Sequence, residues 1–292
     1  MTGVQTCALP IYVEKARQLY SMVLDNFPQN KKAKKGLKRL QNQSAKIIQS
    51  SPTQAQIDHL TALYSGGKLK EAIGVAKLLS QTHPNVPFLH NVLGACYFRL
   101  DQLDDAVKSH ERALEIKPDY AEAHDNLGKA LSALGQLDKA VASFERALEI
   151  RPDYADAHND IGNTFRYLGR LDEAIASYER ALEIKPGYAE AHNNLSALKK
   201  YKPGDVQIDL MESLFSRPES NDSDRMHLCF ALAKAYEDLG EYDKSFDYLN
   251  KGNHLCKKAL NYNIGNDIKL FSNIKGFFSA DSVPFSAVPR SE

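Results

Sequence analysis

Four histidines recur at intervals of 34 residues, as His90, His124, His158 and His192. Histidine is a common zinc ligand, so evenly spaced copies would form a metal site if their side chains met at one point. Zinc ligand atoms must all lie ~2 Å from the ion, whereas packed helices lie ~8–10 Å apart. Equivalent positions of successive repeats are therefore too far apart to share a metal. The pattern predicts half-buried packing side chains and no metal site.

The residues around these histidines belong to a repeat of 34 residues. Residues 118–151 and 152–185 are identical at 20 of 34 positions. In each copy, apolar residues recur twice at steps of three and four, which predicts two amphipathic helices joined by a turn. Gly135 and Gly169 lie at the predicted turns, where glycine tolerates a positive φ. The repeat therefore predicts antiparallel helix pairs, with each histidine on the first helix of its pair.

The helix ends carry signals of their own. Pro118 and Pro152 follow the second helices, and proline cannot continue a helix. Asp119 and Asp153 come next, and their carboxylates are expected to cap the following first helices. These signals set the predicted boundaries of each pair.

Small residues lie where the two helices of a pair approach closely. Gly128 is on a first helix and Ala140 on the second, with the ring of Phe144 beside them. The pattern resembles the tetratricopeptide repeat, which carries Leu-Gly in its first helix, a turn glycine, an alanine, an aromatic and a final proline. The resemblance implies an all-α fold, an α-solenoid of stacked antiparallel helix pairs. The preceding copy departs from this pattern at Asp101, where the turn glycine is expected, and at His110, where an aromatic is expected.

Repeat-like helices cover most of residues 12–260, with weaker copies at 53–86 and 226–259. The predicted organisation is a non-native prefix at 1–11, partial N-terminal repeat helices at 12–52, a repeat array at 53–200, an irregular helical insert at 201–225, a repeat-like connector and docking helix at 226–278, and a tail at 279–292.

A solenoid of this kind presents its first helices on a concave side, and the resemblance implies that this groove binds a protein or peptide segment. In the family, the fifth, sixth, ninth, twelfth and thirteenth positions of the first helix tend to face the groove. The asparagines at these positions resemble the ladder of O-linked N-acetylglucosamine transferases, where amides pair with a peptide backbone of any sequence. The groove candidates carried over in this way are Asn91, Arg99, Asn126, Lys129, Asn159, Asn163, Arg166, Tyr167, Asn193 and Asn194.

Two other interpretations of these side chains stay open. One is that the asparagines and aspartates only solvate an exposed face. The other is a carboxylate clamp, as in chaperone-binding relatives, with Lys129 and Arg166 as its cations. Asp125 and Asp160 lie beside these cations in the sequence and weaken such an anion site.

Composition narrows the function classes. Lys plus Arg and Asp plus Glu number 37 each, so the formal net charge is zero and no overall basic field attracts nucleic acid. The basic run at 31–39 lacks interleaved aromatics and predicts a solvated helix.

No apolar run approaches the ~20 residues of a membrane helix. Four separated cysteines form no CxxC pair and favour a reducing, cytoplasmic location.

The predicted partner is therefore a protein or peptide, without nucleic acid or membrane, and the sequence predicts no catalytic residue, cofactor or metal. Repeat ends that lack a neighbour expose apolar faces, so self-association is also expected.

Both ends of the chain are expected to be foreign. The first residues, MTGVQTCALPI, resemble a translated sequencing adapter, and the final RSE is expected to be the other adapter. The chain would then be an internal fragment of a longer protein.

Residues 226–278 resemble the connector of bacterial proteins that join tetratricopeptide repeats to a sulfotransferase domain. In that family a Pro-Arg-Ser-Gly turn holds the nucleotide phosphate, and here Pro289, Arg290 and Ser291 are followed by Glu292 instead of glycine. The chain as given is therefore not expected to be a catalyst. The alternative to a binding module is the substrate-recruiting part of a sulfotransferase, or of a glycosyltransferase, whose catalytic domain is missing.

Overall fold

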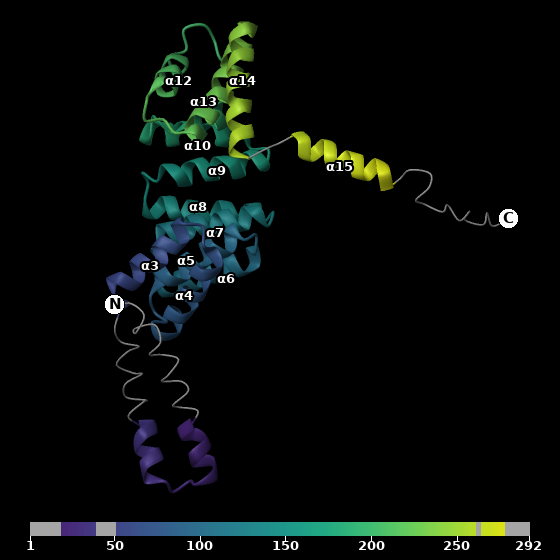
Figure 1. Ribbon diagram of the computed structural model, residues 1–292. Coiled ribbons are helices and arrows are strands. Elements are labelled where there is room, and N and C mark those ends of the chain that lie inside the picture. Colours follow the sequence, from purple (N-terminus) through teal and green to yellow (C-terminus); the bar gives the residue numbers. More distant parts are fainter. Residues whose placement is uncertain (1–18, 39–50, 261–263, 278–292) are drawn as a thin grey trace, which may run out of the picture. The chain divides into compact units, whose positions relative to one another are not determined.

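The computed structural model describes residues 19–38, 51–260 and 264–277 (Figure 1). Every regular element in these ranges is a helix, which confirms the predicted all-α fold. The chain divides into two compact units, residues 1–184 and 185–292, which are described separately. The array predicted for residues 53–200 therefore contributes its last first helix to the second unit. The prefix at 1–11, the tail at 279–292 and the Pro289–Ser291 motif lie outside the described residues.

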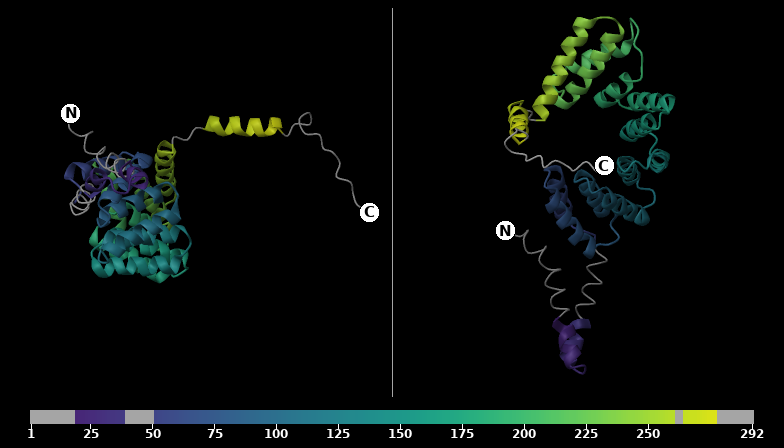
Figure 2. Two further views of the ribbon diagram at one scale, coloured as in Figure 1. Left: turned by 90° about the horizontal axis from the view of Figure 1, so that it is seen from below. Right: turned by 90° about the vertical axis from the view of Figure 1, so that its right-hand side faces the viewer.

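From residue 54 onward, the first unit consists of helix pairs in chain order. Their bounds are α3 (Gln54–Ser65), α4 (Leu69–Thr82), α5 (Pro87–Arg99), α6 (Leu103–Ile116), α7 (Ala121–Ala133), α8 (Leu137–Ile150), α9 (Ala155–Tyr167) and α10 (Leu171–Ile184). Each helix packs on the next, and α7 also contacts α5 and α9, its counterparts in the neighbouring pairs. The blue-to-teal helices of Figures 1 and 2 show this ordered stack, which is the predicted α-solenoid.

Apolar side chains fill the space between stacked helices, because a single pair cannot bury its own apolar stripe. Ala140 and Ala147 of α8 are fully buried, and Phe144 between them is 1% exposed. Tyr178 occupies the same register in α10 and is also fully buried. The predicted small-and-large pattern therefore forms the core of the stack.

The turns within the pairs adopt the left-handed conformation that the glycines predict. Gly135 has φ 73° and Gly169 has φ 74°. Asp101 occupies the same place after α5 and adopts φ 59° without being glycine. A side chain in this region costs energy, although aspartate tolerates it better than most residues.

The predicted aspartate caps are wrong. The N-cap residues of α7 and α9 are Tyr120 and Tyr154, and neither makes a side-chain capping hydrogen bond. Asp119 and Asp153 lie one residue earlier, in the turn. The hydroxyl groups of these tyrosines contact the preceding repeat, as described below.

The second unit contains α11 (Ala189–Ser196), α12 (Val206–Ser216), α13 (Asp222–Asp238), α14 (Tyr242–Ala259) and α15 (Ile264–Phe277). Helix α11 is a first repeat helix followed by a turn at 197–205, and it packs on α13. The predicted insert at 201–225 contains the regular helix α12, which Asp205 caps by accepting a hydrogen bond from the Gln207 backbone. Tyr201, Met211 and Leu232 belong to the core of this unit.

Helix α15 forms where an apolar docking helix is predicted, and its apolar side chains are exposed. Ile268 is 60% exposed and Phe271 68%. The surface on which α15 docks stays a prediction.

Residues 19–26 and 31–38 are also helical, and Lys31, Lys32, Lys34 and Lys35 of the basic run are exposed. Within the three described ranges, no helix combines the length and the apolar character needed to cross a bilayer.

Candidate functional site

The four periodic histidines each hold the turn that precedes their helix. The Nε2 atoms of His90, His124, His158 and His192 lie 3.1, 2.9, 3.0 and 2.9 Å from the carbonyl oxygens of Pro84, Pro118, Pro152 and Pro186. A carbonyl only accepts, so Nε2 carries the proton and donates. Burial lowers the pKa of His90, His158 and His192. Each ring therefore ties a proline turn to the next helix, which gives the recurring histidine a structural role.

The fifth position of the first helix is buried in α5, α7 and α9, and two of the groove candidates occupy it. Asn91 is 8% exposed and Asn159 fully buried. Asp125, at the same register in α7, is 1% exposed. Tyr154 donates a hydrogen bond from its hydroxyl to Asp125 Oδ2 at 3.2 Å, and Asn91 Nδ2 lies 3.4 Å from the hydroxyl of Tyr120. Asn91 and Asp125 thus connect one repeat to the next, and a contact of the buried Asn91 and Asn159 with a partner stays a prediction.

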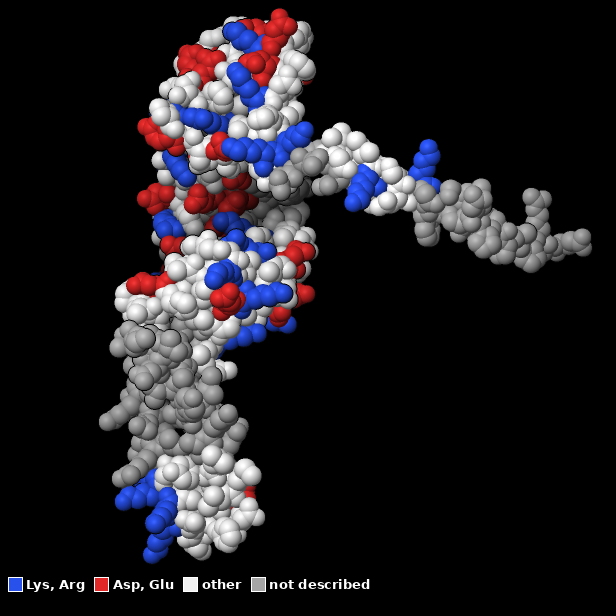
Figure 3. Space-filling model, in the orientation of Figure 1, with Lys and Arg blue, Asp and Glu red and all other residues white. Residues whose placement is uncertain are grey.

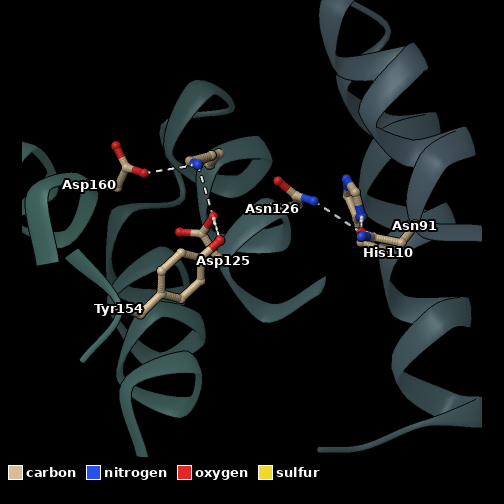
Figure 4. A network of polar contacts seen from close by, with 7 residues as sticks. Asn91, His110, Asp125, Asn126, Tyr154 and Asp160 are labelled. Atoms are coloured by element: carbon tan, nitrogen blue, oxygen red, sulfur yellow. Dashed lines mark hydrogen bonds and ion pairs between the residues drawn. The ribbon is translucent and has the colours of Figure 1, made fainter. Parts of the chain in front are cut away.

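Lys129 lies between two carboxylates from neighbouring repeats (Figure 4). Its Nζ is 2.8 Å from Asp125 Oδ2 on its own helix and 3.0 Å from Asp160 Oδ2 on α9. Burial lowers the pKa of Lys129, but Asp160 and Asp125 outweigh it and raise the pKa overall. Burial raises the pKa of Asp125, and Lys129 and Tyr154 oppose that rise. The ammonium is therefore matched by two anions before any partner arrives.

A second polar chain connects α5, α6 and α7 (Figure 4). His110 Nδ1 donates to Asn91 Oδ1 at 2.9 Å, and Asn126 Nδ2 donates to the same oxygen at 3.1 Å. His110 is fully buried, and burial, followed by the charge of Lys129, lowers its pKa to about 4. The ring is therefore neutral at neutral pH and serves as a packing group with one internal hydrogen bond.

A pocket of about 610 Å³ opens beside the Lys129 cluster, within the size range of ligand sites. It lies among α5, α7, α8 and α9, and three of the groove candidates line it: Lys129, Asn163 and Tyr167. The other lining residues are Phe98, Ser132, Ala133, Gly135, Leu137, Phe144, Asp160 and Thr164.

The remaining candidates do not line the pocket. Arg99 donates from Nη1 to the Tyr64 carbonyl oxygen at 2.9 Å, with its guanidinium 5.2 Å from the centre of the Tyr64 ring. The guanidinium of Arg166 lies 5.5 Å from the centre of the Tyr167 ring. Asn193 and Asn194 are half-buried in α11 of the second unit. The structure therefore does not show the ten candidates as one surface.

Sequence reasoning missed the second-helix contribution to the pocket. Leu137 and Phe144 belong to α8, whereas the prediction considers first helices alone. Ser132 and Ala133 were missed because small side chains such as these do not by themselves indicate a binding site. A comparison of the twelfth and thirteenth positions between repeats would have found them.

Charges elsewhere on the repeats are mixed. In Figure 3, acidic and basic side chains alternate over the repeat helices of the visible face, whereas residues 31–38 carry a mainly blue group. Exposed pairs such as Arg112 with Glu115 and Arg146 with Glu149 lie one turn apart on second helices. Surface pairs of this kind contribute little stability and keep the outer face solvated.

Comparison with known families identifies tetratricopeptide repeats in this chain. A family model described as tetratricopeptide repeat matches residues 85–153 and 119–187, and a second model of the same description matches residues 227–253. The chain therefore contains this repeat in both of its units, as the sequence pattern predicts.

Similar proteins extend the comparison. An uncharacterised protein of Aquifex aeolicus (strain VF5) is 37% identical over 65 residues, which are 22% of this chain and 8% of that protein. The chain thus spans only a small part of that relative. A tetratricopeptide repeat protein of Thermus thermophilus, TTC0263, is 20% identical with a TM-score of 0.47, and the match covers 68% of this chain and 97% of that one. YrrB, described as having an unusual peptide-binding site, is 20% identical with a TM-score of 0.45 over 71% of this chain and 97% of YrrB.

Proposed function

We propose that this chain is a protein-interaction module that binds an extended peptide segment along α5, α7 and α9. The pocket beside Lys129 carries the proposal, because it is a concave feature on which three successive first helices converge. Ligand sites are typically concave, mostly apolar and supplied with a few placed polar groups.

Two amides provide the polar contacts of the proposed groove. Asn163 lines the pocket, and its Oδ1 accepts a hydrogen bond from the Tyr178 hydroxyl at 2.9 Å. That bond fixes the amide so that its Nδ2 group is turned away from Tyr178. Asn126, on α7 outside the pocket lining, is fixed the other way round: its Nδ2 donates to Asn91, which leaves its Oδ1 to accept from a peptide N–H. Anchored amides suit a peptide backbone, because Asn163 can donate to a carbonyl and Asn126 can accept from an N–H without losing side-chain freedom on binding.

A carboxylate clamp fits the site poorly. A clamp needs cations whose hydrogen-bond donors point at the ligand, and Lys129 already pairs with Asp125 and Asp160. An incoming carboxylate would meet two anions as well as the ammonium. We therefore propose recognition of the peptide backbone and side chains rather than of a free C-terminal carboxylate.

The proposal is tested by selecting binders from a random library of peptides on the immobilised full chain. We expect peptides whose affinity falls about five- to tenfold with Asn126→Ala and with Asn163→Ala, the effect of about one hydrogen bond each. Glu145→Ala, on the exposed face of α8, is the matched control and should leave affinity unchanged. Recovery of no peptide, or equal affinity for all three variants, would refute the proposed groove.

The sulfotransferase and glycosyltransferase alternatives stay predictions, because the motif that suggests them lies outside the described residues. The described part of residues 226–278 contains a tetratricopeptide repeat and α15, which suit a binding module equally well. The self-association and the cytoplasmic location predicted above also stay predictions.

A further inference from the structure

The pocket exists because one repeat carries small side chains where its neighbours carry large ones. At the twelfth position of the first helix the three repeats have Phe98, Ser132 and Arg166. At the thirteenth position they have Arg99, Ala133 and Tyr167. The middle repeat therefore leaves a recess with large side chains on both sides.

The walls of this recess are mainly apolar. Phe98 from α5 and Tyr167 from α9 lie on its two sides, and Leu137 and Phe144 from α8 line it as well. Tyr167 is 68% exposed, so its ring is accessible at the edge of the recess. Exposed aromatic rings beside a pocket are the common anchors of protein recognition.

The charged groups of the recess exclude an anion. Lys129 and Asp160 line it, and Asp125 pairs with Lys129 from beneath, at 1% exposure. One ammonium thus faces two carboxylates, at 3.0 and 2.8 Å. An acidic side chain entering the recess would add a third negative charge and would have to displace an existing ion pair.

We infer that the recess formed by Ser132 and Ala133 takes an aromatic or aliphatic side chain of the bound peptide and rejects an acidic one. This inference rests on the proposed function and names the class of peptide that the groove selects. The neighbouring repeats also show how to test it. Large side chains at these two positions are compatible with the fold, because Phe98 and Tyr167 occupy them one repeat before and one repeat after.

The experiment fills the recess of the full chain with Ala133→Tyr and, separately, with Ser132→Phe. Ala133→Ser and Ser132→Ala are the matched controls, because they keep the side chains small. Thermal melts of all four proteins check that each remains folded. The selected peptides are then titrated against each protein by fluorescence anisotropy, both as recovered and with their shared apolar residue changed to Asp or Ala.

The expected result is a shared Phe, Tyr, Trp, Leu or Met in the selected peptides. Both filling substitutions should weaken binding at least tenfold, whereas the controls stay within twofold of the wild type. Replacement of the apolar residue by Asp should weaken binding more than replacement by Ala. The inference is overturned, with the proposed function intact, if Asn126→Ala and Asn163→Ala weaken binding but the filling variants do not. It is also overturned if the shared residue is acidic.

A second probe keeps the two proposals distinguishable if no peptide is recovered, an outcome that refutes the proposed function. N-acetylphenylalaninamide is titrated into the full chain with ¹³C-labelled alanine methyl groups. A shift of the Ala133 methyl signal that N-acetylaspartamide does not cause would support the recess as an apolar site. No shift of that signal would overturn the inference.

Discussion

The imidazole ring of His110 lies directly against the backbone of Gly94, where an added Cβ would come within 2.6 Å of the ring. Phe144 holds the same relationship to Gly128, and a Cβ there would lie 2.7 Å from its ring. The ring of a second helix thus replaces the side chain that the first helix lacks. Each of these helix pairs therefore depends on a glycine in its first helix and a ring that packs against it from the second helix.

Gly128→Ala is expected to lower the free energy of unfolding by about 1–2 kcal/mol, because overpacking against Phe144 exceeds the gain in helix propensity. Gly74→Ala in α4 is the matched control, since nothing lies within 4 Å of a Cβ at that glycine. It should stabilise the protein by up to about 1 kcal/mol. Urea denaturation midpoints measure both, and a stabilising Gly128→Ala would contradict the close packing.

His110 is expected to make the protein acid-sensitive. Burial holds its pKa at about 4 in the folded state, against 6.5 ordinarily. As pH falls below about 6.5, the unfolded chain binds a proton that the folded chain does not, so stability is lost, and the loss levels off below about pH 4. Because of this group, the free energy of unfolding should fall by about 1.4 kcal/mol for each pH unit between these two values.

His110→Phe, which supplies the ring that Phe144 supplies one repeat later, should remove this slope from the stability–pH curve. Urea denaturation between pH 7 and 4 measures the difference from the wild type. Parallel curves for the two proteins would show that His110 does not titrate as its burial indicates.

Asp101→Gly is expected to stabilise the first unit by about 0.5–1 kcal/mol. Asp101 adopts φ 59° after α5, and glycine removes the left-handed strain at some cost in chain entropy. Gly135→Ala, at φ 73°, is the reciprocal change and should cost about 1 kcal/mol. Thermal denaturation of both variants measures the effect, and a destabilised Asp101→Gly would mean that the aspartate has a role beyond the turn.

Lys129→Met is expected to destabilise the protein by about 3 kcal/mol, because it leaves Asp125 buried beside a thioether instead of an ammonium. Adding Asp125→Asn should recover most of that loss, since Asn91 and Asn159 already occupy this register in the adjacent repeats. Chemical denaturation of the single and double variants forms the test. A double variant no more stable than Lys129→Met would show that the ammonium does not act mainly on Asp125.

The exposed apolar face of α14 is expected to drive self-association. Tyr242 and Phe246 are 70% and 66% exposed, whereas Val141 at the register of Phe246 in α8 is 7% exposed. Phe246→Lys should therefore shift a concentration-dependent sedimentation coefficient toward that of a monomer without lowering the melting temperature. Lys244→Gln on the same helix is the control. A wild-type protein that is monomeric at every concentration would contradict this prediction.

The sequence by itself determined the repeat period, the helix pairs and the packing of rings on glycines. Gly135 and Phe144 have these roles because local chain geometry and side-chain volume dictate them, and both repeat in register. The sequence also predicted a structural role for the periodic histidines. The proline carbonyl groups that they bind could not be predicted, because that contact depends on the path of the turn.

Only the tertiary structure decided which polar residues are buried between the repeats and which stay accessible. Consecutive helical residues point about 100° apart, so Asn91 and Asp125 turn toward the next repeat, while Asn126, one position later than Asp125, is only partly buried. The pocket could not be predicted from the sequence either. Its walls come from α5, α7, α8 and α9, and whether Ser132 opens a recess depends on how closely those helices stack.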